Sequence, residues 1–299
     1  MSFAWLSWSN PVAVWWGFLL TVSAINIALL FGLRACYRVN PFKARGVAFA
    51  VEPLALLSTV YVLGCAFRSI LPRADVQRIC LFNTWLSSVL VGRSVATIAE
   101  LCFVIQWAIV LSDLGRIAHS DTARNIAKLV VPLIVLAECC SWYAVVSRDF
   151  LGNALENSLW TITFALIGIA LVRLAVSFRG VAQFALAALA AGTAGYVVLC
   201  SIDVPMYFAR WQTQLADGTH YLGLLAGLHD LATHWVVTRS FARWHNEMPW
   251  MSLYFSVAVW TSLLLGGFGL IRHLVPRYRV RRPLLKVTRR PIPIAIRSS

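Results

Sequence analysis

The chain has 299 residues, of which 60% are hydrophobic and only 13% are charged. Soluble proteins are about 45–50% apolar and about 25% charged, so this composition excludes a soluble globular domain, a disordered chain and a disulfide scaffold. The net charge of +14 would suit nucleic-acid binding, but nine of the 26 basic residues follow Ile271 and most others lie at the ends of apolar blocks. That distribution is typical of membrane orientation, so we expect no nucleic-acid partner.

Apolar blocks of about twenty residues predict seven transmembrane helices, because a helix of that length crosses a hydrocarbon core roughly 30 Å thick. Backbone polar groups find no water inside a bilayer, so each span has to be helical. The predicted fold is an all-α integral membrane bundle over residues 1–275, followed by a basic cytoplasmic tail, 276–299. In chain order the predicted spans are 11–33, 48–67, 93–112, 129–147, 158–178, 181–202 and 250–271.

The basic residues also predict which side of the membrane each end of the bundle faces. The loops after the odd-numbered spans, together with the tail, carry 18 lysines and arginines, whereas the opposite side carries seven. Cytoplasmic loops are the ones enriched in lysine and arginine. We therefore expect the N-terminus outside and the C-terminus in the cytoplasm.

Two further apolar segments are ambiguous. Residues 79–92 are too short to cross a membrane alone and should extend the third span or lie on the outer surface. Residues 219–238 contain His229, Asp230 and His234. An eighth span there would place the basic tail outside, so we expect an amphipathic or re-entrant outer helix between spans six and seven.

Cysteine and histidine spacing predicts no metal site and no cofactor. The seven cysteines have no C-x-x-C pattern, and most lie inside apolar runs as small hydrophobic residues. Cys65 and Cys80 flank one short loop and could pair in an oxidising compartment. His229 and His234 are five residues apart, which puts them off one helical face, and there is no H-E-x-x-H motif.

Ionisable side chains inside the spans are the strongest functional signal, because a charge there is costly unless it is paired or hydrated. In the third span, Arg93, Thr97 and Glu100 share one helical face that continues to Trp107. Arg93 and Glu100 could also form a purely structural pair. Glu138 lies near the middle of the fourth span with no basic residue within two turns. It must be protonated, hydrated or paired with another helix. Glu52, directly before Pro53, is interpreted as a helix-start residue.

Polar and aromatic side chains from four spans converge on the outer half of the membrane. Eleven of the 13 tryptophans lie in the same half or in outer loops, where they either line a pocket or anchor the helices in the interface. Pro205 is predicted to end the sixth helix, which would leave Asp203 and Arg210 to cap or gate the outer mouth. The residues predicted to contact a substrate are Arg93, Thr97, Ser141, Trp142, Asn157, Trp160, Tyr196 and Arg210.

The predicted function is that of a membrane-embedded enzyme that acts by acid–base chemistry on a lipophilic, lipid-like or isoprenoid-like substrate. Glu138, Glu100 and Asp203 are its predicted catalytic residues, because an intramembrane acid can protonate an olefin or epoxide and aromatic faces stabilise the resulting cation. The expected partners are membrane lipids and a lipophilic small molecule. Two alternatives remain: a transporter, channel or seven-helix receptor that uses the same acids, and a subunit whose polar residues meet partner helices.

Overall fold

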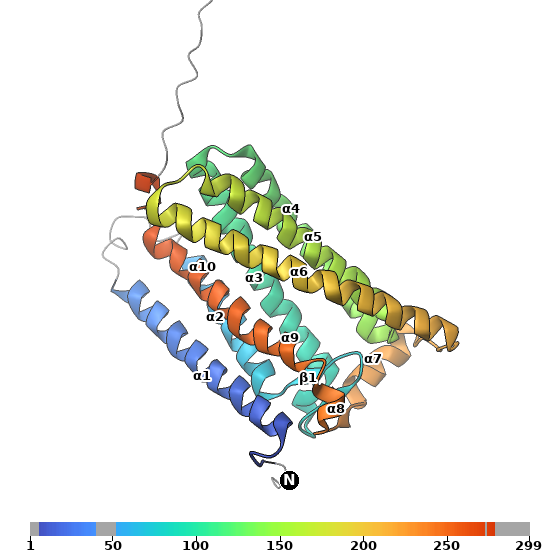
Figure 1. Cartoon of the computed structure of the whole chain (residues 1–299). Helices are drawn as coiled ribbons and strands as arrows, with labels where there is room; N and C mark the ends of the chain where they lie inside the picture. The colour runs from blue at the N-terminus through green and yellow to red at the C-terminus, as the bar shows by residue number, and fades with distance from the viewer. Residues whose placement is uncertain (1–5, 40–51, 273, 279–299) are drawn as a thin grey trace, which may run out of the picture.

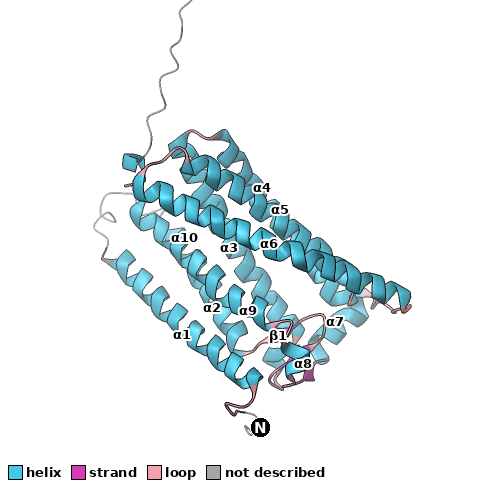
Figure 2. Ribbon diagram, in the orientation of Figure 1, coloured by secondary structure: helices cyan, strands magenta, loops and turns pink. Residues whose placement is uncertain are grey.

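The computed structural model describes residues 6–39, 52–272 and 274–278, and the tail beyond Tyr278 and the start of the second predicted span lie outside these ranges. Seven helices in the described chain are long and apolar enough to cross a membrane, as expected of a multi-pass membrane protein (Figures 1 and 2). The first six are α1 (Pro11–Arg38), α2 (Glu52–Ile70), α3 (Val89–Ala118), α4 (Asp121–Ser147), α5 (Phe150–Ala175) and α6 (Gly180–Ala216). The seventh is made of α9 (Met248–Leu253), a π-helical turn η4 (Tyr254–Ala258) and α10 (Val259–Ile271).

Several helices begin earlier than the hydrophobic pattern predicts, because side-chain caps set their first residues. Ser88 accepts a hydrogen bond from the backbone N–H of Val91 at the start of α3. Asp149 accepts one from the N–H of Leu151 at the start of α5, eight residues before the predicted span. Such caps satisfy backbone donors that the helix itself leaves unpaired. The result is that polar residues just outside a predicted span belong to the helix.

The prediction that Pro205 ends the sixth helix is wrong, because α6 continues through it to Ala216. Proline removes one backbone hydrogen bond from a helix interior. The far end of α6 is nevertheless held by Gln214, whose side chain donates to the carbonyl of Arg148 at 2.8 Å and accepts from the N–H of Phe150 at 3.0 Å. This tie to the start of α5 stabilises the last turns of α6 beyond the proline.

A small sheet lies at one end of the bundle, so the fold is not purely helical. Its strands are β1 (Arg73–Ala74), β2 (Ile79–Cys80) and β3 (Val236–Val237). β1 and β2 are antiparallel, with Arg73 opposite Cys80, and β2 and β3 are parallel, with Ile79 opposite Val236. We call this end of the bundle, where α1 also begins, the strand end (Figure 2).

Both ambiguous segments lie at the strand end. Residues 79–92 form β2, a 3-10 turn η3 (Trp85–Ser87) and the first turn of α3. Residues 219–238 contain α7 (Leu224–Thr233), which has ten residues and is too short to cross a bilayer. α7 packs on α3 and α4 and is followed by β3 and the short helix α8 (Phe241–Trp244). A second 3-10 turn, η5 (Val275–Tyr278), lies at the opposite end.

The helices from α1 to α6 each pack against the next in the chain, and α10 returns to pack on α2, α1 and α3 (Figure 1). α3 is therefore central, whereas α6 packs mainly on α5. Of the seven long helices, α6 is the least buried. Cys65 and Cys80 are both buried free thiols, so the disulfide left open by the sequence is not formed.

Candidate functional site

A cavity of about 1160 Å³ lies between α6 and the helix made of α9, η4 and α10. α3 and α5 also contribute to its wall. At the strand end it is lined by polar side chains that include Asp75 and Glu247, and toward the opposite end by apolar ones that include Leu114 and Val275. Ligand pockets usually measure roughly 300–1000 Å³, so this cavity has room for a lipid-sized molecule.

One face of α3 follows the whole length of the cavity. The residues of α3 that line it are, in order of depth, Arg93, Glu100, Phe103, Trp107, Val110 and Leu114. Their spacing keeps them on one side of a helix with 3.6 residues per turn. The wall formed by α3 thus changes along its length from charged through aromatic to aliphatic.

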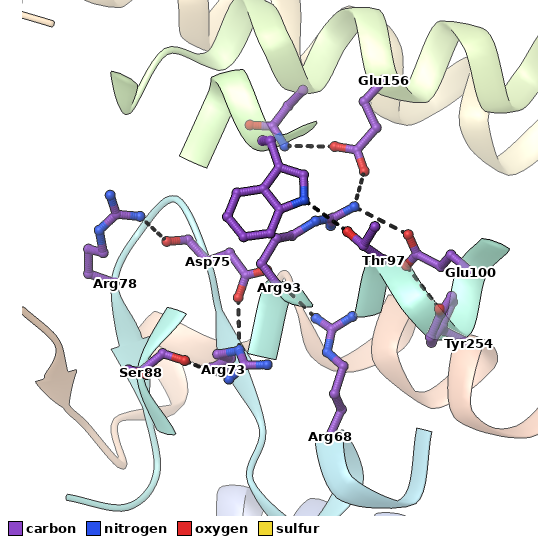
Figure 3. Close-up of polar contacts among 12 residues, drawn as sticks. Arg68, Arg73, Asp75, Arg78, Ser88, Arg93, Thr97, Glu100, Glu156 and Tyr254 are labelled. Atoms are coloured by element: carbon purple, nitrogen blue, oxygen red, sulfur yellow. Dashed lines mark hydrogen bonds and ion pairs between the residues drawn. The ribbon is translucent and has the colours of Figure 1, made fainter. Parts of the chain in front are cut away.

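Three glutamates, Glu100, Glu138 and Glu156, surround the guanidinium of Arg93, and we call these four residues the Arg93 cluster; Figure 3 shows the contacts of Arg93 with Glu100 and Glu156. Nη2 of Arg93 lies 2.7 Å from Oε2 of Glu138, 3.2 Å from Oε2 of Glu100 and 3.3 Å from Oε1 of Glu156. All four side chains are buried, and the three carboxylates come from α3, α4 and α5. Glu138 is therefore paired with another helix, one of the alternatives that its sequence position left open.

Hydrogen bonds from neighbouring side chains reach all three carboxylates, and that on Glu156 is the longest, from the amide of Asn153 at 3.4 Å. Thr97 donates to Oε2 of Glu138 at 2.5 Å, and the indole N–H of Trp142 donates to the hydroxyl of Thr97 at 3.1 Å. The hydroxyl of Tyr254, in the π-helical turn, donates to Oε1 of Glu100 at 2.9 Å (Figure 3). Single π-turns often occur at functional sites.

One carboxylate oxygen from each glutamate of the Arg93 cluster lies within 4.8 Å of the other two, a spacing that would suit a metal ion. Nη2 of Arg93 already lies among them and supplies the positive charge that an ion would bring. The histidines of residues 219–238 make other contacts. His229 lies 3.4 Å from the hydroxyl of Thr233, and His234 lies 2.9 Å from a carboxylate oxygen of Asp230.

Aromatic rings line the cavity beside the Arg93 cluster. Phe164 of α5 packs against Tyr196 of α6, with ring centroids 4.4 Å apart, and against Trp160 at 5.9 Å. Phe103 stacks on Tyr61, with centroids 4.8 Å apart. All five rings line the cavity. This wall is apolar but carries π-electron density that attracts positive charge.

Seven of the residues predicted for the site line the cavity: Arg93, Glu100, Ser141, Asn157, Trp160, Tyr196 and Asp203. Glu138, Thr97 and Trp142 do not line it, but their hydrogen bonds connect them to the Arg93 cluster. Arg210 does not itself line the cavity, but its guanidinium lies 5.6 Å from the ring centroids of Phe150 and Tyr207, which do.

The tryptophans at the strand end are mostly structural. Of the ten that the structure describes there, only Trp160 and Trp250 line the cavity. Several others donate a hydrogen bond to a neighbouring segment. For example, Trp15 donates to the hydroxyl of Ser252 at 3.1 Å, and Trp244 to the carbonyl of Thr238 at 2.9 Å.

Sequence reasoning missed four groups of the site. Glu156 lies two residues before the predicted fifth span, 158–178, but α5 begins at Phe150 with Asp149 as its cap and so contains Glu156 in its second turn. Tyr254 carries no signal in the sequence, because only the π-helical turn directs it at Glu100. Arg68 and Arg73 counted merely as outer loop charges, yet both line the cavity.

The last turn of α2 and the segment that follows it place three charges at the polar end of the cavity. Nε of Arg73 lies 3.0 Å from Oδ1 of Asp75, and Nη2 of Arg68 lies 4.0 Å from Oδ2 of the same carboxylate. Burial lowers the pKa of Arg73 to about 10. Burial alone would raise the pKa of Asp75, but the charges of Arg73 and Arg68 outweigh it and hold that pKa below its ordinary value.

Glu247 is the cavity-lining acid just before α9. Its carboxylate accepts a hydrogen bond from the side chain of Gln77 at 3.0 Å. Burial raises the pKa of Glu247 above its ordinary value. Asp203, on the α6 side, is half-buried and makes no hydrogen bond or ion pair with any described residue.

No family model, curated protein or solved structure matches this chain. The chemistry of the site is therefore interpreted from its own geometry.

Proposed function

We propose that this protein is a membrane-embedded enzyme that uses acid–base chemistry on a lipophilic, lipid-like or isoprenoid-like substrate held in the cavity. The observation that carries the proposal is the Arg93 cluster, in which three buried carboxylates share one guanidinium nitrogen. Two of them, Glu100 and Glu156, line the cavity where a substrate would lie.

The balance of charges in the Arg93 cluster implies that one of its glutamates is protonated and can act as an acid. One guanidinium compensates one carboxylate, and like charges this close in a buried site cannot all be ionised. The cluster therefore holds at least one proton at neutral pH. A positioned group that can give up and take back a proton is what general acid–base catalysis requires.

The hydrogen bonds divide the roles among the glutamates. Glu138 accepts the two shortest bonds, from Arg93 at 2.7 Å and Thr97 at 2.5 Å, which favours its anionic form. It does not line the cavity, so we assign it a positioning role that orients Arg93. Glu100 lines the cavity and is our candidate for the group that transfers the proton, with Tyr254 holding its other oxygen.

The rest of the cavity suits an apolar substrate with a reactive double bond, epoxide or similar group. Phe103, Phe164 and Tyr196 lie where positive charge would develop after proton transfer, and aromatic faces stabilise cations by about 0.5–2 kcal/mol each. The aliphatic end of the cavity would hold the remaining chain. Asp203 lines the cavity and makes no hydrogen bond with any described residue, so its carboxylate would orient a polar part of the substrate.

The test compares purified wild-type protein with the Glu100→Gln variant in nanodiscs loaded with a lipid extract of the expression host, with products followed by mass spectrometry. The amide keeps the shape of the side chain but cannot transfer the proton, so the product should form roughly 10²- to 10⁴-fold more slowly. Asp217→Asn, an acid-to-amide change at an exposed position beyond α6, is the matched control and should keep full activity. A folded Glu100→Gln variant with wild-type turnover would refute the proposal.

The length of the cavity favours a transporter as the second candidate. It extends from Asp75 at the strand end to Val275 near the opposite end. Its deeper part is apolar, which is unsuited to an ion but compatible with movement of a lipid. A transporter would move a fluorescent lipid across proteoliposomes without chemical change, whereas the enzyme would convert its substrate to a new mass.

A further inference from the structure

Arg68 and Arg73, which we call the arginine pair, carry an uncompensated charge at the polar end of the cavity. Arg68 belongs to the last turn of α2 and Arg73 to β1, and both line the cavity. Their one acidic partner is Asp75, at 4.0 Å from Arg68 and 3.0 Å from Arg73. Two guanidiniums with one carboxylate leave one positive charge without an ion-pair partner of its own among the described residues.

The arginine pair also has hydrogen-bond donors for which the described part of the chain offers no acceptor. Arg68 makes no hydrogen bond with any described residue, and its other close contact is a packing of the guanidinium over the ring of Phe255. Its side chain is 15% exposed. Arg73 is 1% exposed and donates to the carbonyl of Ser88, and its Nη2 is buried against Gly92 of α3 with no hydrogen-bond partner among the described residues. Unsatisfied charged donors in a buried site are costly, so such donors point to a ligand that accepts from them.

We propose that Arg68 and Arg73 bind the anionic headgroup of an amphiphilic substrate, through a phosphate or comparable oxyanion. This inference rests on the proposed function and gives its substrate class. Guanidinium groups match the oxygens of a phosphate or carboxylate with paired donors, and they keep their charge at neutral pH. The tail then extends between α6 and α10, past the Arg93 cluster.

The neighbourhood agrees with that placement. Figure 3 shows the guanidinium of Arg68 directed toward the Arg93 cluster, with Arg73 beside it. A headgroup held there would set the adjoining part of the chain near Glu100 and Tyr254. Glu247 also lines this end of the cavity, where burial raises the pKa of its carboxyl above the ordinary value.

Binding of short-chain phosphatidic acid tests the inference, measured by the intrinsic tryptophan fluorescence of detergent-purified protein. Diacylglycerol with the same chains is the neutral comparison, and inorganic phosphate is the free anion. We expect phosphatidic acid to bind at least about tenfold more tightly than diacylglycerol, and Arg68→Gln to weaken phosphatidic acid binding roughly 10- to 100-fold. Inorganic phosphate that binds as tightly as phosphatidic acid would overturn the assignment to a headgroup.

The controls separate the contact from general charge effects and from misfolding. Arg34→Gln removes an exposed arginine on α1 and should leave the affinities for phosphatidic acid and for diacylglycerol unchanged. Arg68→Lys keeps the charge but loses the fork of donors, so it should retain part of the preference. Arg68 is the primary target, because the more deeply buried Arg73 also supports the loop.

The outcome is independent of the acid–base proposal. Glu100→Gln should keep the preference for phosphatidic acid over diacylglycerol, because that preference depends on the arginine pair and not on Glu100. If the wild type shows no preference for phosphatidic acid over diacylglycerol, the headgroup inference fails while a neutral substrate remains open to the Arg93 cluster. If instead Glu100→Gln turns over normally, the proposed function fails while the measured headgroup preference stands.

Discussion

Arg93 holds together three helices through one nitrogen atom. Its Nη2 contacts carboxylates of α3, α4 and α5, and its side chain is 7% exposed. Taking charged groups out of water is expensive, and a buried pair recovers this cost only while both partners are present. Removal of one residue of the Arg93 cluster therefore leaves the remaining buried charges without a partner, which destabilises the folded protein.

Replacement of Arg93 should destabilise the protein, and a second substitution should reverse part of the loss. Arg93→Gln leaves three acids without a cation, which we expect to cost about 3–5 kcal/mol and to lower the melting temperature. Adding Glu138→Gln removes one of the stranded carboxylates and should restore part of the stability. The double-mutant cycle, measured by thermal melting, reports the coupling. Strictly additive effects would mean that the two side chains do not interact.

Tyr254 should affect activity more than stability. Tyr254→Phe removes the donor to Glu100 without changing the ring, so we expect roughly tenfold slower product formation and about 1 kcal/mol loss of stability. Tyr143→Phe is a matched control, because that exposed tyrosine donates at 2.9 Å to Asp149, which does not line the cavity. The prediction fails if both variants change turnover equally.

Close helix contacts depend on glycine at one crossing in particular. A Cβ at Gly152 of α5 would lie 2.6 Å from the carbonyl of Cys140 and 2.7 Å from the Cβ of Ala144, both on α4. Gly152→Ala must therefore push α4 and α5 apart, along with the glutamates that they carry. We expect about 1–3 kcal/mol of destabilisation by thermal melting. Gly17→Ala on α1, where nothing lies within 4 Å, should be neutral or slightly stabilising.

The loops and α7 at the strand end should show a two-part response to acid. Burial raises the pKa of Glu247 above its ordinary value of 4.5, so its ionised form destabilises the folded protein at neutral pH. As the pH falls toward 4.5, Glu247 becomes protonated in the folded state and the protein regains that stability. The pKa of Asp75 and of Asp230 is lower than 3.8, because nearby arginines outweigh the effect of burial. Their stabilisation is present above pH 3.8 and is lost as the pH falls through their folded-state pKa values.

Melting temperature should therefore rise slightly between neutral pH and about pH 4.5 and fall steeply below about pH 3.8. Glu247→Gln should abolish the rise and leave the fall. Asp230→Asn leaves the buried Arg78 without the carboxylate that lies 2.8 Å away, so it should lower stability at neutral pH and weaken the fall. An unchanged acid profile in both variants would contradict these assignments.

At the scale of the whole molecule, the sequence predicts the helices well and their mutual contacts poorly. Seven spans follow from apolar length, and the shared face of Arg93 and Glu100 follows from helical periodicity. The partner of Glu138 lies on another helix, so no local pattern contains it. Likewise, the caps at Ser88 and Asp149 start α3 and α5 before their apolar blocks begin. The hydrogen bonds of Gln214 to the start of α5 stabilise the part of α6 that follows Pro205.

The distribution of charge between the two ends predicts orientation. At the strand end, arginines such as Arg73 and Arg78 are buried and paired with acids. At the opposite end, Arg34, Arg173 and Arg179 are exposed, where they can reach anionic headgroups. The cytoplasmic side of a membrane protein is the side enriched in exposed basic residues. We therefore expect the strand end to face outward.

Labelling of cysteines in intact cells with a membrane-impermeant maleimide tests this orientation. In a background where the other cysteines are replaced, Thr219→Cys, at an exposed position of the strand end, should react at once. Cys36, exposed near the opposite end of α1, should react only after the membrane is permeabilised. The reverse labelling pattern would place the strand end, with the polar end of the cavity, on the cytoplasmic side. The arginine pair would then bind an anionic amphiphile from the inner leaflet. The basic end of the bundle would face outward and would no longer contact the anionic lipids of that leaflet.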